Sequence, residues 1–160
     1  MRFVMCGMLG AGFGGLLLTM GLGLGWIHAE HRIAWHWQVA IWTVLLLLAA
    51  HTLVLFYFLA TGKQLRVLMQ SSGLPVNQQY LQEMRLYKSR VFPPLMLAIG
   101  ATITTFVVGA GVSVGTVPGT VHLALALLAL LSNLHAGFRE MRFLRCNSRL
   151  IRKIELEYLR

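Results

Sequence analysis

The residues best suited to chemistry in this sequence are histidines that interrupt long apolar segments. His51 lies between Leu45–Ala50 and Leu53–Phe58, and His122 heads a strip of small residues in a later segment. An ionisable side chain at such a depth is costly to expose to lipid, so we expect both rings to face protein. Helical bundles hold haem between facing helices, and imidazole is an axial ligand of haem iron. The pair therefore predicts either a haem site or neutral histidines hydrogen-bonded between helices.

The spacing of the histidines limits the haem hypothesis to one group. His36 and His51 are 15 residues apart and His122 and His135 are 13 apart, which is about 22 and 20 Å along a helix. At about 100° per residue, the second pair points to nearly opposite faces, so two stacked haems are disfavoured. We therefore take haem b as the candidate cofactor, with His51 and His122 as its axial ligands. A moderate helix tilt brings these two residues to one level.

Two other patterns resemble known sites but lack the necessary context. His28, Glu30, His31 and His36 lie within one short segment, yet their spacing defines no rigid metal site, so we expect solvated histidines at an interface. The run Gly10–Gly15 matches the formal dinucleotide-binding pattern, but it lies inside an apolar segment without strands. We therefore expect no metal site and no catalytic site, so that the protein is not itself an enzyme.

The elements that must position these histidines are membrane-spanning helices. Hydrophobic residues make up 57% of the 160-residue chain and charged residues only 12%, about half the usual share for a soluble domain. Uncharged runs cover residues 3–27, 37–62 and 91–138, and the Pro-Gly pair at 118–119 splits the last run. A helical span needs about 20 apolar residues. We expect a single all-α integral membrane domain over residues 1–160, a four-transmembrane-helix bundle with helices near 4–27, 37–61, 93–115 and 120–138.

The basic residues orient this bundle. Of 14 Lys and Arg, only Arg32 lies in the segment between the first two expected helices, and the turn between the last two has none. Basic residues favour the cytoplasmic side. We therefore expect both termini, the loop 62–92 and the tail 139–160 to be cytoplasmic, in a bacterial inner membrane. The +9 formal charge suits anionic lipid at that face rather than nucleic acid.

Small residues predict which helix faces pack closely. The first segment holds Gly10, Gly14, Gly21 and Gly25 at 4-7-4 spacing, a small-xxx-small pattern. The last segment repeats small and polar residues at heptad spacing, and the third offers small residues that we expect to meet them. These helix-packing residues are Ala126, Ala129, Asn133 and Glu140 in the last segment, and Gly100, Thr104, Val107 and Gly111 in the third.

The middle loop and the tail have helical patterns of their own. Val76, Tyr80, Met84 and Tyr87 share one helical face, opposite basic and amide side chains, so we expect an amphipathic helix lying on the membrane surface. Phe92-Pro93-Pro94 is expected to end or bend this helix before the third span. The tail after Phe138 is expected to be helical, lying on lipid or on a partner.

The composition and motifs leave three function classes open. The first is an accessory or anchoring subunit of a larger membrane complex, with other membrane subunits as partners and homo-oligomerisation left open. The second is a b-type haem electron-transfer subunit, using His51 and His122. The third is a small oligomeric channel or transporter, with a polar path lined by His51, Thr52, Thr104, His122 and Asn133.

Overall fold

The computed structural model describes residues 2–71 and 75–158, and within them long α-helices joined by short loops form the fold, without strands. The helices are α1 (Arg2–Leu24), α2 (Arg32–Ser71), α3 (Gln78–Ser113) and α4 (Gly119–Tyr158). Each is long and apolar enough to cross a membrane. The expected all-α four-helix architecture is therefore confirmed, although three of the helices are much longer than the spans expected from the sequence.

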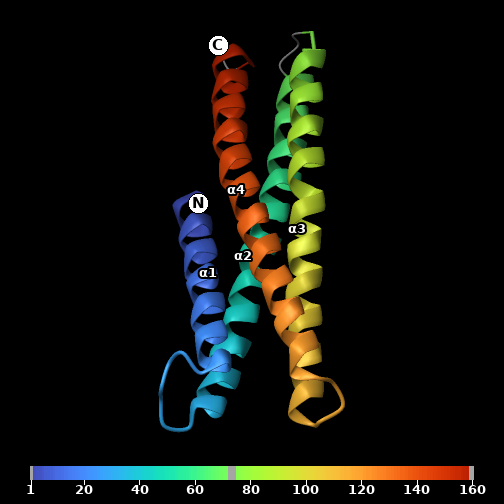
Figure 1. The fold of residues 1–160 in the computed structure, drawn as a ribbon. Coiled ribbons are helices and arrows are strands. Elements are labelled where there is room, and N and C mark those ends of the chain that lie inside the picture. The colour runs from blue at the N-terminus through green and yellow to red at the C-terminus, as the bar shows by residue number, and fades with distance from the viewer. Residues whose placement is uncertain (1, 72–74, 159–160) are drawn as a thin grey trace.

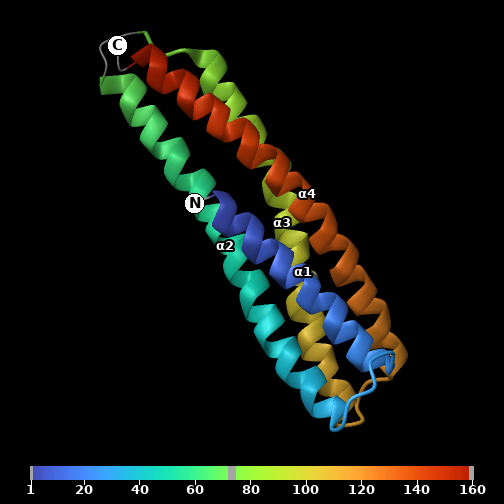
Figure 2. The same cartoon turned by 90° about the vertical axis from the view of Figure 1, so that its left-hand side faces the viewer.

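The four helices form two antiparallel hairpins, α1–α2 and α3–α4, that lie side by side (Figures 1 and 2). The hairpin loops, residues 25–31 and 114–118, lie at one end of the bundle. Toward the other end, the N-terminus of α1 lies only about halfway along the bundle, and α2, α3 and α4 continue past it as a three-helix extension. Gly25 and Gly115 follow α1 and α3 with positive φ angles of 78° and 76°, a conformation in which glycine avoids the strain of a Cβ.

The two prolines, expected to end or bend the helix, do not end α3. Pro93 and Pro94 lie inside the continuous helix Gln78–Ser113. A proline has no N–H to donate to the carbonyl four residues earlier. Pro93 therefore leaves the Ser89 carbonyl, and Pro94 the Arg90 carbonyl, without its helical hydrogen bond. Both of these residues are exposed, so their carbonyls remain accessible to other donors. The amphipathic segment and the third span therefore form one helix.

The amphipathic segment does not lie on the membrane surface as expected, because its apolar face is buried in protein. Tyr80 and Met84 pack with α2 and α4 in a cluster that forms the core of the extension. The buried members of this cluster are Leu65, Met69, Tyr80, Met84, Leu150, Ile154 and Tyr158. The tail likewise continues α4, and its apolar side faces α2 and α3. The expected break at residues 71–75 falls mainly on residues 72–74, outside the described residues.

Close approach of α1 to α2 uses glycines next to those singled out in the sequence. A Cβ at Gly12 would lie 2.5 Å from Leu47 Cδ2, and one at Gly15 would overlap the Thr43 hydroxyl. Gly10 and Gly14 have nothing within 4 Å of that position, while Gly21 meets Ile27 of the hairpin loop and Gly25 meets Arg32 at the start of α2. The pattern of glycines every fourth residue thus lies one position away from the contact face.

The α3–α4 contact combines the expected face of α4 with a different face of α3. Ala129, Asn133 and Glu140 are buried on α4, and Ala126 lines a cavity described below. On α3, however, Thr104 and Val107 are exposed and Gly100 has no neighbour within 4 Å of a Cβ. Gly111 meets Val117 of the hairpin loop. The inward face of α3 instead carries Ala98, Ala101 and Thr102.

Candidate functional site

The main cavity lies between the two hairpins, in the half of the bundle that carries the hairpin loops. Its volume is about 550 Å³, and all four helices line it. Most of the lining is apolar, and a smaller number of polar side chains from all four helices complete it. A mainly apolar cavity of this size with a few convergent polar groups is typical of a ligand or cofactor site. Those polar residues are Thr19, His36, Thr43, Thr102, Thr105, Ser113, Thr120 and His122.

Two histidines from different hairpins face each other in this cavity. The ring centroids of His36 on α2 and His122 on α4 are 6.4 Å apart, and the two rings are nearly perpendicular, at 83°. Each residue lies in the first two turns of its helix. The pair is therefore close to the loop end of the bundle and spans the boundary between the hairpins.

His36 is held by the neighbouring helix of its own hairpin. Its Nδ1 lies 2.9 Å from the Thr19 carbonyl oxygen and donates to it. Thr19 in turn donates its hydroxyl proton to the Gly15 carbonyl. The ring packs on Gly23, where a Cβ would lie 3.0 Å from ring atom Cε1. Because Nδ1 carries the proton, Nε2 of the neutral ring keeps its lone pair for a ligand.

His122 has the same environment in the second hairpin. Its ring packs on Gly109, where a Cβ would lie 2.8 Å from Cε1. In contrast to Nδ1 of His36, Nδ1 of His122 is buried without a hydrogen-bond partner among the described residues. Thr105 donates its hydroxyl proton to the Ala101 carbonyl, as Thr19 does to Gly15. The two histidines thus occupy equivalent positions in two similar hairpins.

The sequence carries this equivalence as an internal repeat with an offset of 86 residues. Thr19 precedes His36 by 17 residues, and Thr105 precedes His122 by the same number. At the same offset, buried positions of the first hairpin correspond to buried positions of the second. Identical residues at this offset include Gly14 and Gly100, Thr19 and Thr105, Gly23 and Gly109, Gly25 and Gly111, His36 and His122, and Ala40 and Ala126; buried equivalents include Met5 and Val91, Leu9 and Leu95, and Phe58 and Leu144.

The repeat places the histidine pair on a local two-fold axis. Both hairpins run in the same direction, so the axis that relates them lies along the bundle, as in membrane proteins built from parallel repeats. Two equivalent histidines meet across such an axis only if the axis passes between their rings. A ligand bound there receives the same imidazole from each half of the chain.

A second cluster of polar side chains lies deeper in the bundle. His51 Nδ1 is 2.7 Å from Glu140 Oε1, and His51 Nε2 is 3.0 Å from Asn133 Oδ1. The Asn133 amide nitrogen donates to Thr102 Oγ1 and to the Ala129 carbonyl. His51 and Glu140 are 1% and 0% exposed. Side chains of α2, α3 and α4 are therefore joined in one buried network.

The structure does not bring His51 and His122, the two candidate haem ligands of the sequence analysis, together. Both ring nitrogens of His51 already contact Asn133 and Glu140. Asn133 lies 11 residues after His122, which is about 16 Å further along α4. Of the two, only His122 lines the main cavity, and its facing residue is His36. His36 is thus not one of the solvated interfacial histidines that its neighbours in the sequence suggest.

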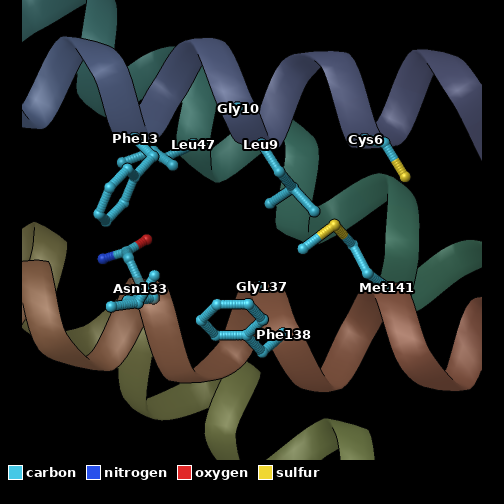
Figure 3. A pocket seen from close by; sticks show the side chains of 10 residues that line it. Cys6, Leu9, Gly10, Phe13, Leu47, Asn133, Gly137, Phe138 and Met141 are labelled. Atoms are coloured by element: carbon cyan, nitrogen blue, oxygen red, sulfur yellow. The ribbon is translucent and has the colours of Figure 1, made fainter.

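A smaller cavity of about 160 Å³ opens between α1 and α4. In Figure 3 the Asn133 amide points from α4 toward Phe13 on α1, and Cys6 and Met141 flank the other end. Its lining is otherwise apolar. This cavity is separated from the histidine pair and offers few groups for recognition.

The histidine pair is suited to binding a metal that already has other ligands. Two imidazoles alone are too few for a tetrahedral metal site. Within the described residues there is no group of three or more His, Cys, Asp or Glu side chains arranged to hold a metal ion.

No family model matches the chain, and neither a curated protein nor a solved structure is detectably similar to it. The geometry of the site therefore carries the functional argument.

Proposed function

We propose that this chain is an integral membrane protein that binds one haem b between His36 and His122 and transfers electrons within a membrane complex. The basic residues favour an orientation with the hairpin loops outside the cytoplasm and the three-helix extension inside it, since among the described residues Arg32 is the only Lys or Arg near the hairpin loops. Exposed Trp26 and Trp35, near the hairpin loop 25–31, fit the interface on the outer side. The histidine pair then lies near the outer surface.

The distance between the two rings is the observation that carries the haem proposal. An imidazole nitrogen binds a metal at about 2.0–2.1 Å, and the ring centre lies about 1.1 Å behind it, so two imidazoles on opposite sides of one metal have centres roughly 6.2–6.4 Å apart. The centroids of His36 and His122 are 6.4 Å apart. Edge-to-face rings without a metal also lie about 4.5–7 Å apart, so the distance supports the proposal together with the cavity and the glycine contacts of the two rings.

The surroundings favour haem over a bare ion. Haem supplies four equatorial nitrogens to its iron, so it needs only the two ligands that the cavity offers. Gly23 and Gly109 each leave room for one imidazole against the neighbouring helix. The Thr19 carbonyl fixes the His36 tautomer, as expected for a metal-binding imidazole. The mainly apolar lining suits a porphyrin face.

Electron transfer is the activity that this site best supports. With both axial positions taken by histidine, the iron would have no open position for oxygen or a substrate. The residues of the cavity include no carboxylate or cysteine that could act as acid, base or nucleophile. The protein therefore relays electrons, and the chemistry at either end of the relay belongs to its partners, in keeping with a subunit of a larger complex.

An absorption spectrum of the purified protein tests this function. A Soret band that shifts on reduction, with about one haem per chain, is expected. His36→Gly and His122→Gly should remove it, and added imidazole should restore it by filling the space of the lost ring. His31→Ala and His135→Ala are matched controls, because both side chains are exposed and lie outside the cavity. Loss of the band in His51→Ala with retention in His36→Gly would instead support the His51–His122 pairing.

A further inference from the structure

The buried His51–Glu140 pair is not used by the proposed haem site, and its hydrogen bonds allow its protons to be counted. The Asn133 amide nitrogen has two acceptors, Thr102 Oγ1 and the Ala129 carbonyl, which fixes Oδ1 as the atom facing His51. An amide oxygen only accepts, so His51 Nε2 donates to it. One further proton then lies between His51 Nδ1 and Glu140 Oε1. Whichever atom carries that proton, the pair has no net charge.

Glu140 has a second carboxylate oxygen that is buried without a hydrogen-bond partner. This atom, Oε2, receives no donor from the described residues. Leaving a buried acceptor unpaired is unfavourable, and native structures usually avoid it or use it. With the first proton on His51 Nδ1, a proton on Oε2 converts the carboxylate into a neutral carboxylic acid beside an imidazolium. The structure therefore contains one defined position where the pair can take up a second proton.

Few other charged or titratable groups surround the pair. On α2 and α4 the groups that act electrostatically on it are its own two members and the Asn133 amide. On α3, the side chain that contacts the cluster is Thr102, whose hydroxyl oxygen accepts a hydrogen bond from Asn133. On α1, the titratable side chain of Cys6 lines the smaller cavity together with Asn133. Arg139, next to Glu140 in sequence, is half-buried at the edge of the extension. No second carboxylate competes for the proton.

We propose that Glu140 takes up one proton, at Oε2, when the group bound between His36 and His122 is reduced by one electron. This inference rests on the proposed haem function. A one-electron donor, such as a quinol-type partner or dithionite in vitro, reduces the ferric group. A proton from the cytoplasmic side forms an O–H bond with the Glu140 carboxylate. One electron and one proton enter together, and the interior gains no net charge.

The network connects this proton site with the main cavity. Thr102 lines the cavity and accepts a hydrogen bond from the Asn133 amide. Asn133 in turn accepts a hydrogen bond from His51, and His51 is hydrogen-bonded to Glu140. The amide of Asn133 does not readily carry a proton, so the chain does not conduct protons to the cavity. It acts electrostatically instead, because a negative charge added in a low-dielectric interior favours protonation of a buried carboxylate. The proton enters from the Glu140 end, beside the extension.

Redox titration at several pH values tests the inference. At a fixed applied potential, the ratio of reduced to oxidised haem should fall by up to about tenfold for each unit rise in pH, the limit for one proton per electron. Glu140→Gln should abolish this dependence, since its side-chain amide can donate to Nδ1 while Nε2 still donates to Asn133. Glu155→Gln, an exposed position on the same helix, is the matched control and should keep the dependence.

Infrared difference spectra supply a readout in the unmutated protein. Reduction should produce the C=O band of a protonated carboxylic acid, which shifts in D2O and disappears in Glu140→Gln. A Soret band with a pH-independent potential and no carboxylic acid band would overturn the proton inference alone. Absence of bound haem in the purified protein, also after reconstitution with hemin, would overturn the proposed function and this inference with it.

Discussion

Substituting two adjacent glycines of α1 separates close packing from helix propensity. Gly14 has open space where a Cβ would lie, whereas a Cβ at Gly15 would lie 3.2 Å from Thr43 Cβ and overlap its hydroxyl. Alanine at either position gains the same helix propensity, up to about 1 kcal/mol, because both lie mid-helix. Gly15→Ala additionally overpacks the α1–α2 contact, which typically costs about 1–3 kcal/mol. Thr43 is β-branched and 5% exposed, so its side chain has few alternative rotamers.

The difference between the two variants therefore measures the packing contact, because the propensity contributions cancel. Gly14→Ala should be equal to or more stable than the parent, and Gly15→Ala should be about 1–3 kcal/mol less stable than Gly14→Ala, measured by reversible unfolding in mixed detergent micelles. Thr43→Ala should restore stability when combined with Gly15→Ala, which gives a coupling free energy of the same size. Equal stabilities, or a double variant without coupling, would refute the assignment of Gly15 as the contact position.

Two further predictions concern the polar clusters. Glu140→Ala should lower the free energy of unfolding by about 3–5 kcal/mol, because it leaves His51 Nδ1 buried without a partner. A loss of about 0.6 kcal/mol, the average for hydrogen bonds between membrane helices, would show that the His51–Glu140 pair contributes no more than a usual interhelical hydrogen bond. In the extension, Tyr80 donates its phenolic proton to Glu157, and this hydrogen bond raises the pKa of Tyr80 to about 12. The native state therefore holds this proton more tightly than the unfolded chain, so the contribution of Tyr80 to stability should be constant below pH 10 and fall between pH 10 and 12. Tyr80→Phe should lose that part of the fall. An identical alkaline profile in the variant would contradict the assignment.

The sequence was sufficient to predict the helices because their signal is local. Uncharged runs and the Pro-Gly pair at 118–119 separate the four segments without any tertiary information. Helix ends were less well predicted: the amphipathic segment and the tail are expected to be helical, but the sequence does not show that they continue the third and fourth spans without a break. Arg85 and Arg142, for example, lie inside continuous helices whose apolar sides pack on each other beyond the apolar segments.

The candidate site was only partly predicted because its partners lie in different hairpins. His122 was recognised from its apolar surroundings, but His36 was grouped with neighbouring histidines of the hairpin loop, although it lies on α2. The signal that distinguishes His36 is the shared Thr-x3-Gly-x12-His spacing at an offset of 86 residues. Glu140 was placed on the inward seam of its helix, but its pairing with His51 was missed. Nothing in the spacing of two residues 89 apart reveals a buried bond.

The two halves of the chain are alike around the cavity and differ at the buried pair, and this contrast bears on function. At the 86-residue offset, His51 corresponds to Gly137 and Glu140 to Val54, so the two-fold counterpart of the pair contains no titratable group. A symmetric pocket supplies two equal imidazoles, which suits a symmetric metal centre. Proton uptake from one side of a membrane requires an asymmetric group instead. The repeated pair His36 and His122 suits the proposed metal centre, and Glu140, the buried carboxylate of the second half, suits the proposed one-sided proton uptake.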